Sequence, residues 1–124
     1  MQFLHSGLAM DIKIKSKIWI EVGGKPVFGR GRRFLLEAID RHGSISQAAR
    51  EINISYRKAW GYIKVMEERL GLKLIDRQTG GRHGGGAALT NDARDFLKKY
   101  EAIDEGIREI VDDRFNSIFR ANDS

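Results

Sequence analysis

The spacing of apolar residues changes along the chain, and each spacing predicts a different element. Between residues 12 and 22, β-branched residues on one face alternate with Lys13, Lys15, Lys17, Trp19 and Glu21 on the other, and only Ser16 interrupts the apolar face. This period of two is typical of a half-buried strand. Residues 23–26, Gly-Gly-Lys-Pro, then predict a turn, and residues 27–28 a short returning strand. The lysine face is expected to be a solvated edge, with contact to phosphate as the alternative.

A helical spacing begins at Arg30 and continues to Arg41. Its apolar stripe consists of Phe34, Leu35, Ala38 and Ile39. Gly43 is expected to end this helix, because the position after a C-cap often has a positive φ, which glycine adopts easily. Ser46 is expected to be the N-cap of the next helix. The first helical segment therefore leads directly into a second one.

The segment that follows has the features of a helix-turn-helix. Ala49 is small enough for two helices to cross closely. Asn53 stands where the turn needs a left-handed backbone, which asparagine tolerates. Ser55 is expected to cap a third helix, which Gly71 ends. The predicted buried stripe of this third helix consists of Ala59, Ile63, Met66 and Leu70.

The outer side of the third helix is basic and aromatic. No acidic residue occurs in it before Glu67, which favours a helix that lies against phosphates and base edges in a DNA major groove. For Trp60 and Tyr62, packing in an ordinary core is the alternative. The residues expected on this side are Tyr56, Arg57, Lys58, Trp60, Gly61, Tyr62 and Lys64.

A glycine-rich hairpin is predicted after the third helix. Leu72, Leu74 and Ile75 begin one strand, residues 87–89 return, and five of the seven residues from 80 to 86 are glycine. No Gly-Lys-Ser/Thr closes the segment, so it is not a nucleotide-binding loop. A flexible linker is the alternative. We favour a wing that approaches the sugar-phosphate backbone, with Arg82 and His83 at its tip.

A long final helix is predicted from Thr90, its expected N-cap, to residue 119. It would be roughly 45 Å long, and its apolar stripe is too long for the preceding residues to cover. The pattern favours self-association through this helix, with packing back onto the body as the alternative. We therefore divide one structural domain into a body, residues 1–90, and a dimerisation helix, residues 91–124. The expected interface residues are Phe96, Tyr100, Ile103, Ile107, Ile110 and Val111.

Composition restricts the classes of protein that remain. The 124 residues, 41% hydrophobic and 31% charged with one proline, are typical of one soluble globular domain. The absence of cysteine excludes disulfides, thiolate metal sites and a cysteine nucleophile. No apolar run approaches the roughly 20 residues of a membrane helix, and the N-terminus lacks the features of a signal peptide. A cytoplasmic location is expected.

The net charge of +5 is unevenly distributed. Residues 1–90 carry 16 lysines and arginines and 8 acids, a balance of +8, whereas residues 91–124 carry 6 and 9, a balance of −3. A basic body suggests binding to a polyanion. The alternative is a soluble protein that is basic but binds no polyanion. His5, His42 and His83 fall on separate predicted elements, and no metal-ligand spacing accompanies them. The sequence therefore predicts no enzyme and no metal site.

Three motifs resemble the N-terminal DNA-binding domain of ModE-type molybdate-responsive regulators. They are residues 43–49 (Gly-Ser-Ile-Ser-Gln-Ala-Ala), residues 54–60 (Ile-Ser-Tyr-Arg-Lys-Ala-Trp), and the glycine-rich residues 79–87 with Leu89-Thr90. The wider LysR-type winged helix shares Ala48-Ala49, Ser55, Ile63, Glu67, Leu70-Gly71 and Leu89-Thr90. The resemblance implies a dimer whose third helix enters the major groove of a pseudo-palindromic operator. ModE-type repressors carry molybdate-binding modules after the helix; this sequence ends at Ser124 without them, and His83 departs from the small residue usual in the wing.

The expected fold is mainly α with small β: a winged helix-turn-helix with an N-terminal strand or hairpin and a long C-terminal dimerisation helix. The expected function is that of a sequence-specific transcriptional regulator of molybdenum-related genes, which binds an inverted repeat in double-stranded DNA as a homodimer. No cofactor is expected, and a molybdate response would require another site or partner. The alternative is a winged helix that binds protein instead of DNA. The expected DNA contacts are Ser46, Gln47, Ser55, Tyr56, Arg57, Lys58, Trp60, Gly61, Lys64, Arg77, Thr79, Arg82 and His83.

Overall fold

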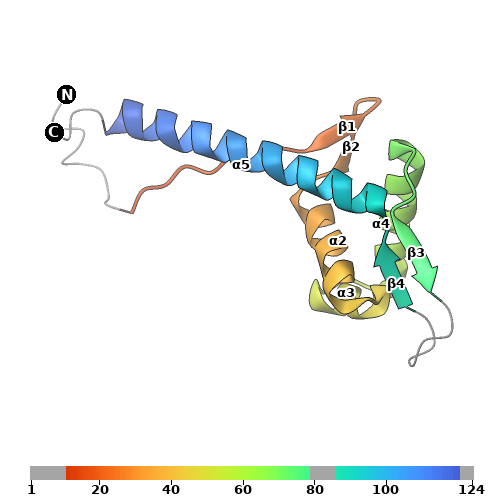
Figure 1. Cartoon of the computed structure of the whole chain (residues 1–124). Coiled ribbons are helices and arrows are strands. Elements are labelled where there is room, and N and C mark those ends of the chain that lie inside the picture. The colour runs from red at the N-terminus through yellow and green to blue at the C-terminus, as the bar shows by residue number, and fades with distance from the viewer. Residues whose placement is uncertain (1–10, 79–85, 121–124) are drawn as a thin grey trace. The chain divides into compact units, whose positions relative to one another are not determined.

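Helices dominate the part of the chain that the structure describes (Figure 1). The computed structural model describes residues 11–78 and 86–120. Two compact units are distinguished: Ile18–Lys99, and a second unit of residues 1–17 and 100–124. The elements, in chain order, are β1 (Ile20–Val22), β2 (Lys25–Phe28), α2 (Arg30–His42), α3 (Ile45–Glu51), α4 (Tyr56–Leu70), β3 (Ile75–Gln78), β4 (Gly86–Leu89) and α5 (Asn91–Phe119). This is the mainly α fold with small β that the sequence predicts.

Strand β1 is shorter than the sequence pattern predicts. It pairs antiparallel with β2 and places Ile20 opposite Phe28. Residues 12–19 form no strand, because β2 is only four residues long and no other described strand pairs with this segment. The predicted strand is therefore wrong for residues 12–19. The exposure of residues 12–19 still alternates. Every odd-numbered residue of this segment is exposed, and its half-buried residues are the even-numbered Ile12, Ser16 and Ile18.

Helix α2 buries a slightly different face from the one predicted. Phe34 is 43% exposed, with the guanidinium of Arg33 at 5.1 Å from its ring centroid. At about 100° per residue, Leu36 lies nearer the centre of the buried arc than Phe34 does, so the predicted stripe is wrong at this position. Gly43 ends the helix as predicted, with φ 63°. The buried residues of α2 are Leu35, Leu36, Ala38 and Ile39.

The turn between α3 and α4 forms as the sequence predicts. Asn53 has φ 64°, in the left-handed region that asparagine tolerates. The hydroxyl of Ser55 accepts a hydrogen bond from the backbone N–H of Lys58 at 3.0 Å and thereby caps α4. Gly71 ends α4 with φ 69°. The two helices are therefore joined by the predicted turn, with α4 positioned as the second helix of a helix-turn-helix.

The N-cap of α3 is not the residue predicted. Ser44, not Ser46, holds the extended backbone of a cap, and its hydroxyl accepts from the backbone N–H of Gln47 at 3.1 Å. Because Gly43 already ends α2, one extended residue is enough to start the next helix. Ser46 lies inside α3 and is exposed. The prediction of Ser46 as the cap is wrong by two residues.

The core of the unit Ile18–Lys99 forms where α2 contacts α3 and β2 and where α4 contacts the same two elements. The first turns of α5 contribute to it, since Ala93 is fully buried and the ring of Phe96 meets that of Phe28 edge-on at 4.9 Å. The predicted stripe of α4 is buried except for Leu70, which is half-buried. The largest fully buried side chains are Phe28, Leu35, Leu36, Ile39, Ile63, Met66 and Leu74.

Strands β3 and β4 form the antiparallel hairpin that the sequence predicts, with Ile75 opposite Leu89. The backbone N–H of Ala87 donates to the carbonyl of Gly43 at 3.0 Å, which ties β4 to the loop between α2 and α3. We call β3 and β4 the wing hairpin. The segment between them, residues 79–85, lies outside the described residues, and so do the predicted contacts Thr79, Arg82 and His83.

Helix α5 runs without interruption for 29 residues and crosses from the first unit into the second. The hydroxyl of Thr90 accepts from the backbone N–H of Ala93 at 3.0 Å, as predicted for its cap. In the second unit the rings of Phe115 and Phe119 stack at 4.7 Å, and Arg120 donates to the carbonyl of Ile12 at 2.9 Å. Among the described residues, no helix is long and apolar enough to cross a membrane.

Candidate nucleic-acid interface

Helix α4 presents the basic surface that its sequence predicts. Arg57, Lys58 and Lys64 are exposed, and none of the three forms an ion pair within residues 11–78 and 86–120. Arg57, Gly61 and Lys64 are spaced by four and three residues, so they share one side of the helix. The charges on this surface are therefore available to an external anion.

The first acid of α4 does not face this basic surface. The carboxylate of Glu67 accepts from the backbone N–H groups of Leu74 and Ile75, at 2.8 and 3.3 Å. It thereby fixes the chain that enters β3. The first two-thirds of α4 consequently has no acidic side chain to repel phosphate.

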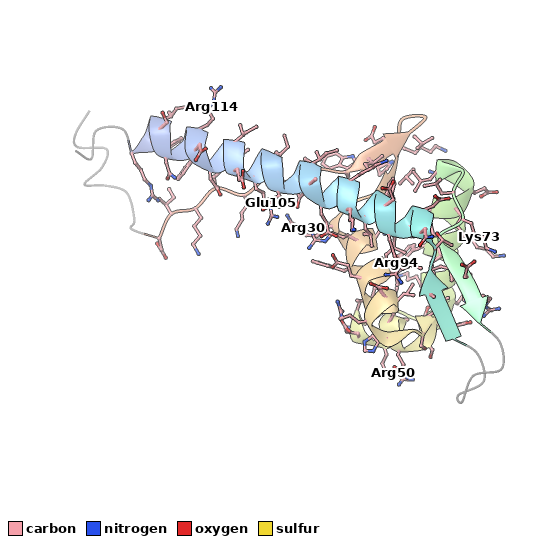
Figure 2. All side chains as sticks on the ribbon, viewed as in Figure 1. Arg30, Arg50, Lys73, Arg94, Glu105 and Arg114 are labelled. Atoms are coloured by element: carbon pink, nitrogen blue, oxygen red, sulfur yellow. The ribbon has the colours of Figure 1, made fainter. Side chains whose placement is uncertain are left out.

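Helix α3 supplies the other predicted contacts of the helix-turn-helix. Ser46 and Gln47 are exposed, as a contact with DNA requires. Arg50, on the same helix, is also exposed, and its side chain projects away from the ribbon (Figure 2). Ser55 is exposed too, but its hydroxyl already caps α4. Sequence reasoning did not select Arg50, although its charge on an exposed helical position was the available signal.

Tyr56, Trp60 and Arg77, which the sequence predicts as separate contacts, lie together in the structure. Arg77 donates from Nη2 to the hydroxyl oxygen of Tyr56 at 3.0 Å. Its guanidinium carbon lies 4.7 Å from the centroid of the Trp60 ring. The two rings meet edge-on at 6.4 Å between centroids. Trp60 is half-buried, so it is neither a fully buried core residue, as the alternative predicts, nor a fully exposed one.

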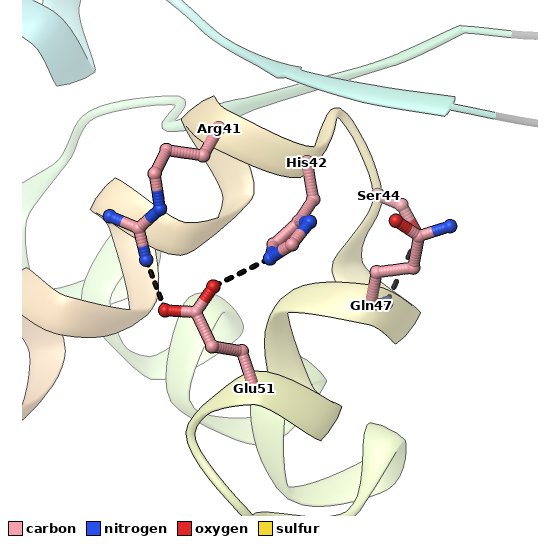
Figure 3. A network of polar contacts seen from close by, with 5 residues as sticks. All are labelled: Arg41, His42, Ser44, Gln47 and Glu51. Atoms are coloured by element: carbon pink, nitrogen blue, oxygen red, sulfur yellow. Dashed lines mark hydrogen bonds and ion pairs between the residues drawn. The ribbon is translucent and has the colours of Figure 1, made fainter.

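A polar cluster that sequence reasoning missed connects the end of α2 to the end of α3. Arg41 Nη2 bonds to one carboxylate oxygen of Glu51, and His42 Nε2 lies 2.6 Å from the other (Figure 3). The signal available in the sequence was the adjacent pair Arg41-His42 at the end of one predicted helix and Glu51, the one acid of the next. This cluster holds the first helix of the helix-turn-helix against α2.

We expect Glu51→Gln to lower stability at neutral pH and to lose this effect in acid. The hydrogen bond from His42, together with the charge and hydrogen bond of Arg41, lowers the pKa of Glu51 below its usual 4.5. A lowered pKa means that the folded state binds fewer protons, so the stabilisation is present above pH 4.5 and disappears as the pH falls through the folded-state pKa. Urea unfolding of both proteins from about pH 7 to about pH 3 measures the difference.

The matched control for this prediction is Glu68→Gln, which removes an exposed acid of α4 that has no ion pair among the described residues. A difference between Glu51→Gln and the unaltered protein that is the same at pH 7 and pH 3 would contradict the role given to the cluster.

The predicted interface residues of α5 divide into covered and exposed ones. Phe96 is half-buried against Phe28, and Tyr100 is 3% exposed, so neither offers much surface to a partner. Ile103 and Ile110 are 58% and 56% exposed. Ile107 and Val111 are half-buried. We call these four predicted residues the apolar ridge; they are Ile103, Ile107, Ile110 and Val111.

A family profile matches the region that contains these elements. The family described as "Bacterial regulatory helix-turn-helix protein, lysR family" matches residues 34–94, from within α2 to the start of α5. Residues 34–94 form a LysR-type helix-turn-helix domain. In this domain α4 is the second helix of the motif, and β3 and β4 follow it as the wing hairpin.

Curated relatives resemble the LysR-type domain and its surroundings at about 40% identity. The DNA-binding transcriptional dual regulator ModE of Escherichia coli (strain K12) is 40% identical over 101 residues, which are 81% of this chain and 35% of the relative. MopB, the molybdenum-pterin-binding protein of Rhodobacter capsulatus, is 40% identical over 83 residues (67% and 31%). The ModE regulator of Haemophilus influenzae is 40% identical over 70 residues (56% and 28%). The chain spans about a third of these relatives' length, and none of the three names denotes an enzyme.

A solved structure shows the same fold. A chain of the crystal structure of the CbnR DBD–DNA complex has a TM-score of 0.53 to this protein at 22% identity. The match covers 70% of this chain and 93% of the other. The winged helix-turn-helix that the sequence predicts is therefore the fold observed.

Proposed function

We propose that this chain binds double-stranded DNA as a sequence-specific transcriptional regulator, with α4 in the major groove. The observation that carries the proposal is the basic side of α4, where Arg57, Lys58 and Lys64 are exposed and lack an ion-pair partner in the described chain. Base edges and phosphates accept hydrogen bonds from such cations. A LysR-type domain over residues 34–94 and ModE regulators among the relatives support the same function. Such a regulator works in the cytoplasm.

Gly61 supports a close approach of α4 to its partner. Glycine inside a helix costs about 1 kcal/mol relative to alanine. A Cβ added to Gly61 would meet no atom within 4 Å, so packing does not require the glycine. Gly61 lies between Arg57 and Lys64 on the basic side and adds no side chain there. The backbone of α4 can therefore come nearer to the floor of the major groove at this position.

We propose that the apolar ridge of α5 makes the protein a homodimer. Ile103 and Ile110 are seven residues apart, two helical turns, and both are more than half exposed. Fully burying an isoleucine contributes about 1.5–3 kcal/mol. A second copy offers the same ridge in a two-fold arrangement, which pairs like with like. Two copies of α4 would then meet an inverted repeat in DNA.

We propose that the regulated genes are related to molybdenum. Three of the relatives support this by name: MopB and MopA of Rhodobacter capsulatus are molybdenum-pterin-binding proteins, and ModE of Azotobacter vinelandii is a molybdenum transport protein. We also propose that DNA binding by this chain is independent of molybdate, since the LysR-type domain itself supplies α4 and the wing hairpin. Enrichment of bound fragments from genomic DNA, with and without molybdate, tests both statements. Recovery of no fragment would contradict the function, and recovery only with molybdate would contradict its independence.

A further inference from the structure

Arg77 belongs to the wing hairpin but its side chain lies on α4. Neighbouring residues of a strand point to opposite faces, and residues two apart share a face. Ile75 is buried at 4% exposure, and Asp76 is exposed. Arg77 therefore shares the face of Ile75, which directs its side chain over α4. There it contacts the hydroxyl of Tyr56 and the ring of Trp60.

Trp60 provides the surface on which the guanidinium rests. A guanidinium carbon 4.7 Å from the ring centroid lies within the range of a cation–π interaction. Tyr56 stands one helical turn before Trp60, and its ring meets Trp60 edge-on with 77° between the planes. Three side chains from two elements thus fix one another before any partner arrives, and fewer side-chain rotamers remain to be ordered on binding.

The direction of the hydrogen bond leaves donors available at this place. A guanidinium can only donate, so the oxygen of Tyr56 accepts from Arg77 and its own O–H remains for another acceptor. The acid next to Arg77 in sequence does not neutralise it, because Asp76 pairs with Lys73 at 3.5 Å. Arg77 forms no ion pair among the described residues. The result is a charged donor beside a hydroxyl donor.

We propose that Tyr56, Trp60 and Arg77 form a preassembled clamp for one phosphodiester group of the DNA backbone, at the junction of α4 and the wing hairpin. Arg77 and the Tyr56 hydroxyl each donate to a phosphate oxygen, and Trp60 is a positioning residue that does not contact DNA. A planar guanidinium suits two oxygens of a phosphate. The clamp rests on the proposed DNA-binding function and adds a division of roles within it. Arg57 reads bases, whereas this cluster anchors the backbone.

Three variants of the full chain test the clamp, each titrated with a random-sequence duplex and with a duplex recovered from the genomic enrichment. Arg77→Ala should weaken binding to both duplexes and reduce the slope of log affinity against log salt by about one. Arg77→Lys keeps the charge and should keep the slope, but it loses the planar donor pair. Tyr56→Phe removes only the hydroxyl, so it should weaken both duplexes roughly tenfold with the slope unchanged.

The matched control is Tyr62→Phe. The sequence places Tyr62 on the outer side of α4, but the structure half-buries its side chain against α2, away from the clamp, so loss of this hydroxyl should leave affinity unchanged. The ring of Tyr62 lies under Arg32 instead, at 3.7 Å from the guanidinium carbon. The double variant of Tyr56→Phe and Arg77→Lys should lose less than the sum of the two single losses, because the two donors act on one phosphate. Thermal unfolding of every variant separates a loss of binding from a loss of fold.

Trp60 has a readout that needs no DNA. Aromatic ring currents shift the resonances of protons above the ring, so the side-chain protons of Arg77 should appear upfield in the free protein and return to ordinary positions in Trp60→Leu. The absence of this shift would overturn the arrangement.

The outcomes separate the clamp from the proposed function. Failure of the unaltered chain to bind any duplex overturns the function and the clamp together. Normal binding with no loss in Tyr56→Phe overturns the clamp alone. A loss in Tyr56→Phe that is confined to the enriched duplex would assign the hydroxyl to a base edge instead of a phosphate, and it would equally overturn the clamp.

Discussion

Replacing Ile103 and Ile110 together with aspartate should convert the protein into monomers and reduce its affinity for an inverted-repeat duplex by about 100-fold or more, because the two binding modules are no longer linked. Both side chains are more than half exposed in the single chain, so the charges should not disturb its own core. In a dimer they would place carboxylates inside an apolar contact, where burial of an unpaired charge is strongly unfavourable. Each half of the operator would then be bound separately. Sedimentation equilibrium and duplex titration measure the two effects.

The matched control places the same two charges outside the apolar ridge. Ala102→Asp combined with Asn116→Asp alters exposed positions of α5 and should leave both the dimer and the affinity intact. A monomeric unaltered protein at micromolar concentration would contradict the proposed dimer. So would a dimer that survives the two ridge substitutions.

Arg57→Ala should weaken binding to the preferred operator about 5- to 150-fold and relax the preference at one base position. A guanidinium that donates two hydrogen bonds to a guanine contributes about 1–3 kcal/mol of discrimination. Arg57 is exposed on the second residue of α4, where side chains of a recognition helix reach base edges. Selection of preferred sequences from a random pool, with the variant beside the unaltered protein, measures the change.

The control for Arg57 removes an equal charge from the other end of the same helix. Arg69→Ala lies in the last turn of α4 and should leave the selected sequence unchanged. If Arg57→Ala also left the selected sequence unchanged, Arg57 would bind the backbone and some other residue would read the base.

The helix-turn-helix could be predicted from sequence because local residues determine it. Asn53, Ser55 and Gly71 each have a backbone or capping requirement that their own chemistry meets. The start of α3 was harder to predict, because Ser44 and Ser46 are both good caps and only the end of α2 decides between them. The periodicity of α2 likewise identified a helix but misplaced one edge of its buried arc, at Phe34.

Contacts between distant residues could not be predicted in this way. Arg77 and Tyr56 are 21 residues apart, and their hydrogen bond depends on how β3 lies against α4. The stripe of α5 is continuous in sequence, yet Tyr100 is buried and Ile103 is exposed. Spacing identifies an apolar face, but only the packing of the chain decides which part of that face remains uncovered. The N-terminal alternation shows the same limit, since residues 12–19 lack a pairing partner among the described strands.

The most direct test of the central claim is the enrichment of genomic fragments by the unaltered protein, followed by footprinting on the strongest of them. We expect two protected half-sites in inverted orientation, with centres about one DNA turn or a multiple of it apart. Their protection should be the same with and without molybdate and should weaken steeply as salt increases. Uniform protection without a shared sequence, or no retained fragment, would contradict a sequence-specific regulator that reads DNA through α4.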